Sequence, residues 1–304
     1  MEVTILGCHS ATPRSNARPS AQLLEMRGHL FLIDCGEATQ IALRNANAKF
    51  SRIKHIFISH LHGDHFYGLF GLISTFQLLG REAEMHIYGP KGIKEAVLLV
   101  IKLGGAYTPF PLYFHELSSK NSELLYEDDK VLVRTIPLQH RVYTNGFLFQ
   151  EKEGERRLNM DAIAQYPEIE ICDYQNIKNG KDITLENGKT IANTELTFEP
   201  HHPQSYAYCS DTVYLEDLAT EIRGTRVIYH ESTFLKINEE LATKTMHATA
   251  YQAGLVAKNA QAEALILGHY SSRYPDVNMF KQEAQEVFKN VFLAEDGKKF
   301  VFEN

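Results

Sequence analysis

The stretch Ile58-Ser59-His60-Leu61-His62-Gly63-Asp64-His65 decides the fold of this chain. It includes the end of a short apolar run typical of a buried strand, followed by four side chains able to bind a metal within six residues. Residues two apart in an extended segment face the same side, so His60 and His62 can share one ion. Asp64 and His65 lie beyond the turn that Gly63 permits and can face a second ion. Imidazole and carboxylate ligands without a thiolate suit zinc, with manganese or iron as alternatives.

A site for two ions needs further ligands, and the ends of other strands can supply them. Three polar side chains each follow an apolar run: His140, Asp211 and His269. A single histidine after a strand is more often a satisfied loop residue than a ligand. Their shared position at strand ends favours one common site.

The distribution of strand and helix patterns along the chain predicts its architecture. Short apolar strands alternate with helical patterns in two β-rich halves, which predicts one α/β domain over residues 1–304, built as a four-layer αββα sandwich. A polar segment without long periodic runs separates the halves and ends in a hairpin signal at Glu186-Asn187-Gly188. We expect this segment to be an inserted arm at about residues 151–190.

Two local predictions concern a helix and the cysteines. Apolar spacing over residues 66–79 predicts a helix that Gly80 ends. The cysteines are far apart, form no Cys-x-x-Cys pair and lie in or beside apolar runs, which predicts reduced thiols in the core: Cys8, Cys35, Cys172 and Cys209.

Composition and charge narrow the class of protein. With 304 residues, 44% hydrophobic and 23% charged, the chain is typical of a globular protein, which excludes a disordered, collagen-like or disulfide-stapled chain. A formal charge of -7 repels nucleic acid overall, so any polyanion has to be held by a local patch or by metal. The start of the sequence has no signal-peptide pattern, and no apolar stretch approaches the roughly 18 residues of a membrane span. We therefore expect a cytoplasmic protein with no membrane partner.

These motifs together resemble a known family. The pattern His-x-His-x-Asp-His, with a distant His, Asp and His at strand ends, resembles the metallo-β-lactamase superfamily. Within that superfamily, the chain is similar to ribonuclease Z over nearly its whole length. The similar segments are residues 32–40, 58–65, 137–141, 208–212, 230–234, 247–249 and 268–274.

The resemblance implies a metal site and its ligands. Two zinc ions are implied per subunit, with manganese or iron as alternatives. One zinc would be held by His60, His62 and His140, the other by Asp64, His65 and His269, with Asp211 bridging the two. Asp34 resembles an acid that supports the metal ligands from behind. From the residues alone, a turn aspartate at a strand end is the alternative explanation of Asp34.

The resemblance also implies an activity. The family's endoribonucleases remove the 3′ trailer of precursor tRNA after the discriminator nucleotide and leave a 3′-hydroxyl. Two metals can generate the attacking hydroxide and neutralise the developing charge, while Asp64 accepts a proton. His247, kept protonated by Glu231, would donate a proton to the leaving oxygen. Without the resemblance, His247 is better explained as a residue at a helix N-terminus and Glu231 as a solvated loop acid.

Substrate contacts are implied at three arginines and at the arm. Arg273 resembles a residue near the terminal nucleotides of the substrate, and Arg14 and Arg18 lie in the loop where relatives sense the CCA end. Here that loop departs from the usual Pro-x-Lys-x-Arg pattern. The arm has six basic and nine acidic residues, a sum of -3, and no Gly-Pro pair. The family's homodimer, in which the arm of one subunit serves the other, is a further implication.

Two other functions remain open on the sequence. A dinuclear-metal phosphodiesterase acting on small cyclic or other diesters would use the same ligands. A metal-containing RNA-binding protein that has lost catalysis would not require Asp64, Glu231 and His247 together, which argues against it.

Overall fold

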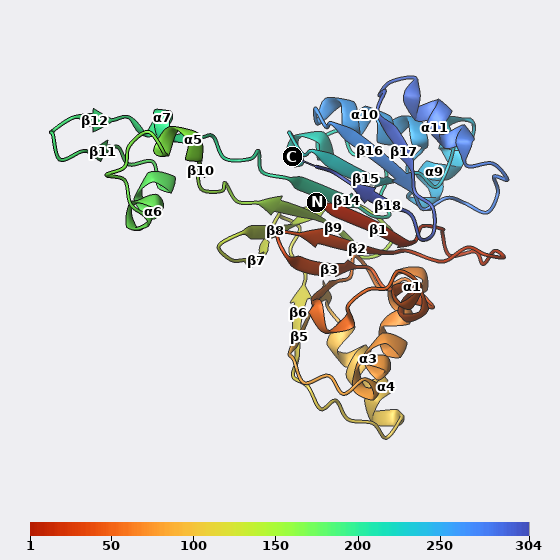
Figure 1. The fold of residues 1–304 in the computed structure, drawn as a ribbon. Helices are drawn as coiled ribbons and strands as arrows, with labels where there is room; N and C mark the ends of the chain where they lie inside the picture. The colour runs from red at the N-terminus through yellow and green to blue at the C-terminus, as the bar shows by residue number, and fades with distance from the viewer. Residues whose placement is uncertain (304) are drawn as a thin grey trace. The chain divides into compact units, whose positions relative to one another are not determined.

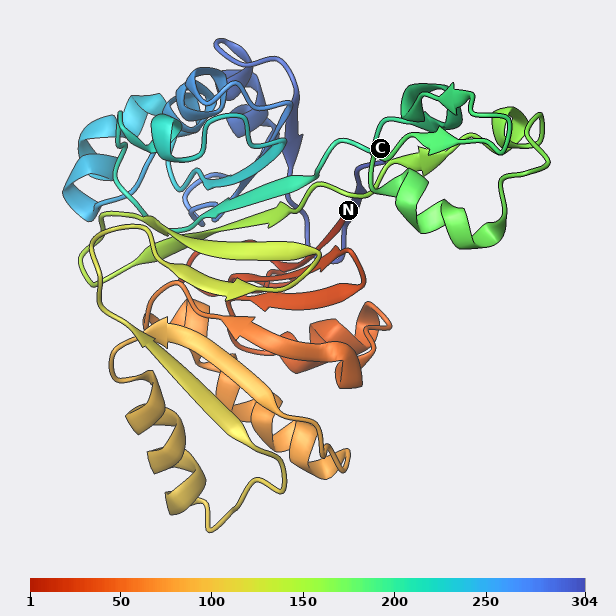
Figure 2. The ribbon, with the colours of Figure 1, turned by 90° about the vertical axis from the view of Figure 1, so that its left-hand side faces the viewer.

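The computed structural model describes residues 1–303, in which two seven-stranded mixed sheets face each other (Figures 1 and 2). The first sheet runs in the order β18 (Lys299–Val301), β1 (Glu2–Gly7), β2 (Ala21–Met26), β3 (His29–Ile33), β4 (Ile53–Phe57), β5 (Met85–Pro90) and β6 (Leu112–Leu117). The second runs in the order β17 (Val291–Leu293), β16 (Ala264–Gly268), β15 (Val227–Glu231), β14 (Ser205–Cys209), β9 (Asn145–Glu151), β8 (Val131–Pro137) and β7 (Leu124–Glu127).

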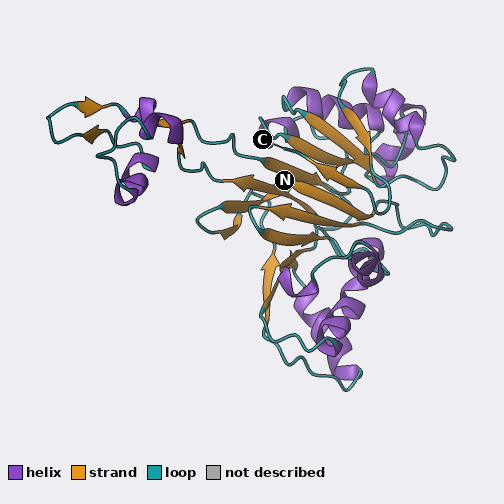
Figure 3. Ribbon diagram, viewed as in Figure 1, coloured by secondary structure: helices purple, strands orange, loops and turns teal. Residues whose placement is uncertain are grey.

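Helices cover the outer face of each sheet, as Figure 3 shows. The first sheet is covered by α1 (Thr39–Asn45), α3 (Gly68–Leu78) and α4 (Ile93–Leu103), whose apolar side chains share one buried cluster with Leu32 and Ile56. The second sheet carries α8 (Leu218–Glu221), α9 (Glu239–Thr245), α10 (Ala250–Asn259) and α11 (Asn278–Gln285). Short 3₁₀ turns lie at Phe50–Arg52 and Lys236–Asn238. The predicted four-layer αββα sandwich is confirmed.

Alternation along the strands explains why the sheets pack face to face. Residues two apart point to the same side of a strand, so Phe31 and Phe57 face inward while their neighbours face the helices. Their rings lie 5.3 Å from Phe149 and 5.4 Å from Phe147 of the opposite sheet, respectively. Aromatic pairs at these distances contribute both buried area and ring contacts to the core between the sheets.

The strand directions bring distant parts of the chain to one edge. In the first sheet β3, β4 and β5 are parallel, and in the second β14, β15 and β16 are parallel. Parallel strands end at the same edge of their sheet. His60 follows β4 of the first sheet, and Asp211 and His269 follow β14 and β16 of the second. The three side chains come together at the adjoining strand ends of the two sheets, next to the end of β15.

A second compact unit, Glu151–Pro203, is inserted in the chain between β9 and β14. It has a small core of its own, formed by Ile163, Ile169, Ile177, Ile191 and Leu196. Its elements are β10 (Arg157–Leu158), α5 (Met160–Ile163), the 3₁₀ turn Ile171–Asp173, α6 (Tyr174–Lys178), β11 (Ile183–Thr184), β12 (Thr190–Ile191), α7 (Asn193–Leu196) and β13 (Thr197–Phe198). The strands β11 and β12 form the hairpin predicted around Asn187-Gly188, and Gly188 has a φ of 83°.

Two local predictions need correction. The single helix expected over residues 66–79 is two helices, because α2 (Gly63–Phe66) ends at Tyr67 before α3 begins. A Cβ at Gly68 would lie 1.8 Å from the carbonyl oxygen of Gly36, so this close approach fixes where α3 starts. Cys172 is exposed in the inserted unit and not part of a core, whereas the other three thiols are buried. None of the helices within residues 1–303 has the length and apolarity needed to cross a membrane.

Candidate active site

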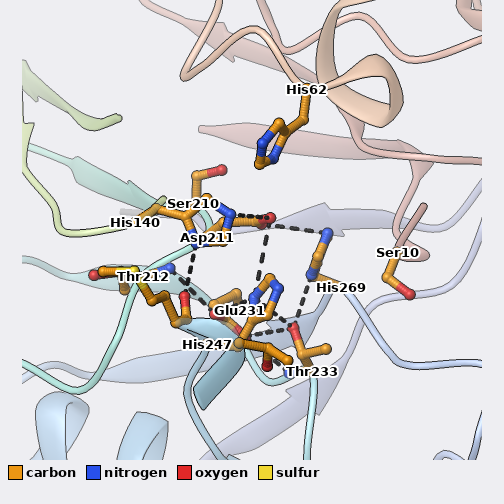
Figure 4. Close-up of polar contacts among 12 residues, drawn as sticks. Ser10, His62, His140, Ser210, Asp211, Thr212, Glu231, Thr233, His247 and His269 are labelled. Atoms are coloured by element: carbon orange, nitrogen blue, oxygen red, sulfur yellow. Dashed lines mark hydrogen bonds and ion pairs between the residues drawn. The ribbon is translucent and has the colours of Figure 1, made fainter. Parts of the chain in front are cut away.

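Asp211, just after β14, lies at the centre of a cluster of buried histidines and carboxylates (Figure 4). Its Oδ1 is 3.4 Å from His65 Nε2 and 3.2 Å from His269 Nε2. Asp64 completes this half of the cluster, with its Oδ2 3.3 Å from His269 Nε2. Four ligand groups that the sequence separates by up to 205 residues are thus gathered around one point.

The other oxygen of Asp211 faces three imidazoles. Asp211 Oδ2 lies 3.7 Å from His60 Nε2 and 3.9 Å from His140 Nε2. His60 Nε2 is in turn 3.0 Å from Nδ1 of His62. All seven predicted ligand residues therefore fall into the two groups expected, with Asp211 common to both.

The donor set fits two metal ions. Asp211 Oδ1 is buried and accepts no well-aligned hydrogen bond within residues 1–303, although Nε2 of His65 and of His269 lie 3.4 Å and 3.2 Å away. An orphaned buried oxygen of this kind is costly unless a cation satisfies it. Ligand atoms around a tetrahedral zinc at about 2.0–2.1 Å lie roughly 3.3–3.4 Å apart, close to the separations seen here.

The charges of the cluster reinforce this fit. Burial opposes ionisation of Asp211, but the charges of His269 and His65 outweigh it and hold the pKa of its carboxyl well below the usual range. Burial lowers the pKa of His60, of His62 and of His140, so these imidazoles are neutral. Ionised carboxylates and neutral imidazoles are the forms that bind metal. Burial alone would lower the pKa of His65, but Asp211 and Asp64 raise it, so this ligand would give up its proton when an ion binds.

Asp34, at the end of β3, orients the ligand His65 from behind. Its Oδ2 accepts hydrogen bonds from His65 Nδ1 (2.7 Å), the Tyr208 hydroxyl (2.6 Å) and the Ser59 hydroxyl (2.9 Å). Holding a proton at Nδ1 leaves Nε2 of His65 free to face the cluster. Asp34 is fully buried, and its carboxylate is satisfied by hydrogen bonds from the site, so its role goes beyond that of a turn residue.

Glu231, the last residue of β15, organises the side of the site next to His247. Its Oε1 accepts hydrogen bonds from His247 Nδ1 (2.9 Å) and from two backbone N–H groups, while Oε2 accepts one from the Thr233 hydroxyl (2.6 Å). Burial would lower the pKa of His247, but the Glu231 carboxylate raises it to about 9. Glu231 is fully buried, which excludes the explanation that it is a solvated loop acid.

A cavity of about 230 Å³ opens onto the cluster. His62, Asp64, His140, His247 and His269 line it, with Ser10–Thr12 contributing from the loop after β1. The three candidate substrate arginines lie outside this lining. Arg14 bonds the carbonyl of Tyr274, Arg18 bonds the carbonyl of Leu6, and Arg273 is exposed.

Some functional groups were not identified from the sequence. Thr233 links Glu231 to the ligand His269, because its hydroxyl also lies 2.8 Å from His269 Nδ1. The carbonyl of Met246 accepts a hydrogen bond from His140 Nδ1 (2.7 Å), and Met246 adopts a φ of 61° to present it. A threonine and a backbone carbonyl have no motif of their own, so only the fold reveals these contacts.

Two sheets between helices, with a His/Asp cluster for metal at the strand ends, define a metal-dependent hydrolase of the metallo-β-lactamase superfamily. The chain is 42% identical to ribonuclease Z of Bacteroides fragilis over 97% of each chain, and 41% identical to that of Bacteroides thetaiotaomicron over 100% of this chain and 96% of the relative. It therefore belongs to the ribonuclease Z family, whose members are metal-dependent endonucleases.

Solved structures agree with this assignment. The short form of human tRNase Z matches with a TM-score of 0.74 and 26% identity, covering 100% of both chains. The metallo-β-lactamase fold protein YhfI of Bacillus subtilis matches at 18% identity with a TM-score of 0.69, over 99% of each chain, which supports the fold alone. A family model described as anti-Pycsar protein Apyc1 matches residues 1–108.

Proposed function

We propose that this chain is a zinc-dependent endoribonuclease that removes the 3′ trailer of precursor tRNA after the discriminator nucleotide, leaving a 3′-hydroxyl. The observation that carries the proposal is the buried His247–Glu231 pair beside the metal cluster, in a chain of the ribonuclease Z family. A proton donor beside two metals suits cleavage of a diester whose leaving oxygen is a poor leaving group.

The residues that would hold two zinc ions are those of the two groups around Asp211. Three imidazoles and a shared carboxylate would bind one ion, and two imidazoles with two carboxylates the other. A donor set of imidazole and carboxylate without thiolate suits zinc. When bound, two such ions supply the positive charge that activates water and neutralises the phosphate in the transition state.

The side chains around the ions would move the protons. Burial opposes ionisation of Asp64, but the charges and hydrogen bonds of His65 and His269 lower the pKa of its carboxyl. Asp64 is therefore a carboxylate that can accept the proton of the attacking water. Nδ1 of His247 is held by Glu231, so Nε2 is the atom that donates a proton to the leaving 3′ oxygen.

We infer that the enzyme works as a homodimer, with a second copy covering an apolar surface of α3 and α4. Leu98, Leu99, Val100 and Leu103 of α4 are all more than 40% exposed, and Leu103 reaches 77%. Leu78, at the end of the neighbouring α3, is 87% exposed. Exposed apolar side chains on two neighbouring helices favour association between subunits. Leu103→Glu should shift the sedimentation coefficient to that of a monomer, and an unchanged coefficient would exclude this surface.

A cleavage assay tests the proposed function. Purified, zinc-loaded protein is incubated with a 3′-extended precursor tRNA, and the cut is mapped at nucleotide resolution. We expect a single metal-dependent cut beside the discriminator nucleotide. Asp64→Ala should abolish this cut while circular dichroism shows an intact fold, and a normal rate in that variant would overturn the mechanism.

The same preparation distinguishes the alternative function. If no RNA is cut while cyclic or chromogenic diesters are hydrolysed, the site is a dinuclear phosphodiesterase for small substrates. If the ions bind but neither class of substrate reacts, the chain is a binding protein without turnover.

A further inference from the structure

A second group of metal-binding side chains lies outside the two groups around Asp211. It consists of Cys8 and His9, directly after β1, and Asp296, in the turn before β18. Their ligand atoms all lie within 4.8 Å of one another, although 287 residues separate His9 from Asp296. No residue of this trio takes part in the chemistry proposed above.

The bonding within the trio leaves ligand atoms available. Asp296 Oδ2 accepts a hydrogen bond from the backbone N–H of Arg18 (2.7 Å) and lies 3.6 Å from Arg18 Nε. Oδ1 accepts a hydrogen bond from the Cys8 thiol at 3.5 Å, and loss of the thiol proton would make both atoms available to an ion. His9 Nδ1 is buried without a hydrogen-bond partner within residues 1–303. A buried imidazole nitrogen with no partner is unfavourable, and a cation would satisfy it.

The chemistry of the trio fits a metal better than a nucleophile. The Cys8 side chain is fully buried, so no substrate can reach its sulfur. Thiolate, imidazole and carboxylate together are a ligand set that zinc accepts, with roughly 3.3–3.8 Å between ligand atoms in a tetrahedral site.

We propose that Cys8, His9 and Asp296 form a third metal site, for Zn²⁺ or a similar divalent ion, that is structural and separate from the active site. This site would tie the loop after β1 to the turn before β18. The proposal is independent of the substrate assigned above.

The backbone shows what such an ion would stabilise. The carbonyl of Cys8 accepts a hydrogen bond from the backbone N–H of the ligand His269 (2.7 Å). Residues Ser10–Thr12, which come directly after the trio, line the active-site cavity. An ion held by Cys8 and His9 would therefore fix both a wall of the cavity and the backbone of one ligand.

Cobalt substitution tests the proposal directly, because the ligands around Asp211 include no thiolate. The whole protein is loaded with Co²⁺, the ions per subunit are counted by mass spectrometry, and the near-ultraviolet thiolate-to-cobalt charge-transfer band is recorded. We expect three ions per subunit and a clear band. Cys8→Ser should lose one ion and the band, while the visible cobalt absorption of the other two ions remains.

Two further variants test whether the charge-transfer band comes from Cys8 and the third ion. Cys172→Ser removes the exposed thiol, which lies 3.8 Å from a Glu170 oxygen, and should leave the band unchanged. Asp296→Asn keeps a hydrogen-bond acceptor for Arg18 but removes the charged ligand, so it should weaken binding of the third ion at least tenfold. This variant tests the site independently if Cys8→Ser does not fold. Two ions without a band in the parent protein, or a band that survives Cys8→Ser, would overturn the third site whatever the outcome with RNA.

Discussion

Asp34 and Glu231 are both fully buried carboxylates, and each is stabilised by hydrogen bonds rather than by a neighbouring lysine or arginine. Each accepts at least one bond from a histidine at the site and others from hydroxyl or backbone groups. Buried acids are tolerated when their oxygens are satisfied in this way. The two residues thereby fix the orientation of His65 and His247.

The role of His247 can be separated from that of the metals by changing the leaving group. His247→Ala should slow cleavage of precursor RNA by about 10²–10⁴-fold, the usual contribution of a general acid. Hydrolysis of a p-nitrophenyl diester should change far less, because its leaving group needs no proton. Rates on both substrates under zinc saturation provide the measurement. Equal losses on the two substrates would remove His247 from the donor role.

The support that Asp34 gives to His65 should appear in metal affinity. Asp34→Ala removes the acceptor for His65 Nδ1 and for the Tyr208 hydroxyl, and we expect zinc affinity to fall by about 10–100-fold. Competition with a chromogenic chelator measures this affinity. Tyr208→Phe removes one of these bonds and leaves His65 in place, so it is the matched control with a smaller effect. Unchanged affinity in Asp34→Ala would contradict the positioning role.

The sequence predicted the metal ligands from their chemistry and their place at strand ends, predicted Glu231 and His247 only through the resemblance to a family, and missed Thr233. His60, His62, Asp64 and His65 lie within six residues, so their spacing alone suggested a shared site. Glu231 has no such signal, because its burial depends on strands that neighbour it only in the fold. Thr233 is similar, since its contact with His269 spans 36 residues.

At the scale of elements, α2 and α3 show how tertiary contact overrides periodicity. The apolar pattern is continuous through Tyr67, but the backbone of α3 must pass close to the loop after β3. Only glycine permits that approach, so the chain breaks the helix there. Helix boundaries of this kind depend on a partner segment that the local sequence does not show.

Adding a methyl group at this contact should destabilise the fold. In Gly68→Ala the new Cβ would meet the Gly36 carbonyl, so we expect the free energy of unfolding to fall by about 1–3 kcal/mol. Urea denaturation measures the difference. Gly104→Ala is the control, because Gly104 has a φ of -74° and only ordinary contacts. Equal stabilities of the two variants would show that the contact at Gly68 is unimportant.

For the whole molecule, the inserted unit can be removed without breaking a sheet. Gln150 of β9 pairs directly with Ser205 of β14 in an antiparallel ladder, so the chain leaves and re-enters the sandwich at adjacent positions. The inserted unit also has its own apolar core. Each unit therefore holds together through contacts of its own.

Replacing residues 151–203 by Asn-Gly should separate RNA binding from chemistry. The resulting three-residue loop, Asn-Gly-Gln204, suits the β9–β14 hairpin and keeps the buried Gln204 that accepts a hydrogen bond from Arg226, so the sandwich and its metal ligands should fold normally. We expect hydrolysis of a p-nitrophenyl diester to persist and kcat/KM for precursor tRNA to fall at least tenfold. Steady-state kinetics on both substrates measure the effect. Full activity on the precursor would show that the inserted unit does not bind the RNA.

Asp211 offers one oxygen to each group of histidines, and this has a consequence for how the enzyme would respond to zinc supply. The carboxylate already faces both groups, so binding at one group would not have to rebuild the other. The two ions would bind in separate steps, the second more weakly because it meets the charge of the first. Activity would then follow occupation of the weaker position, so that tRNA processing would depend on the zinc supply at that position alone.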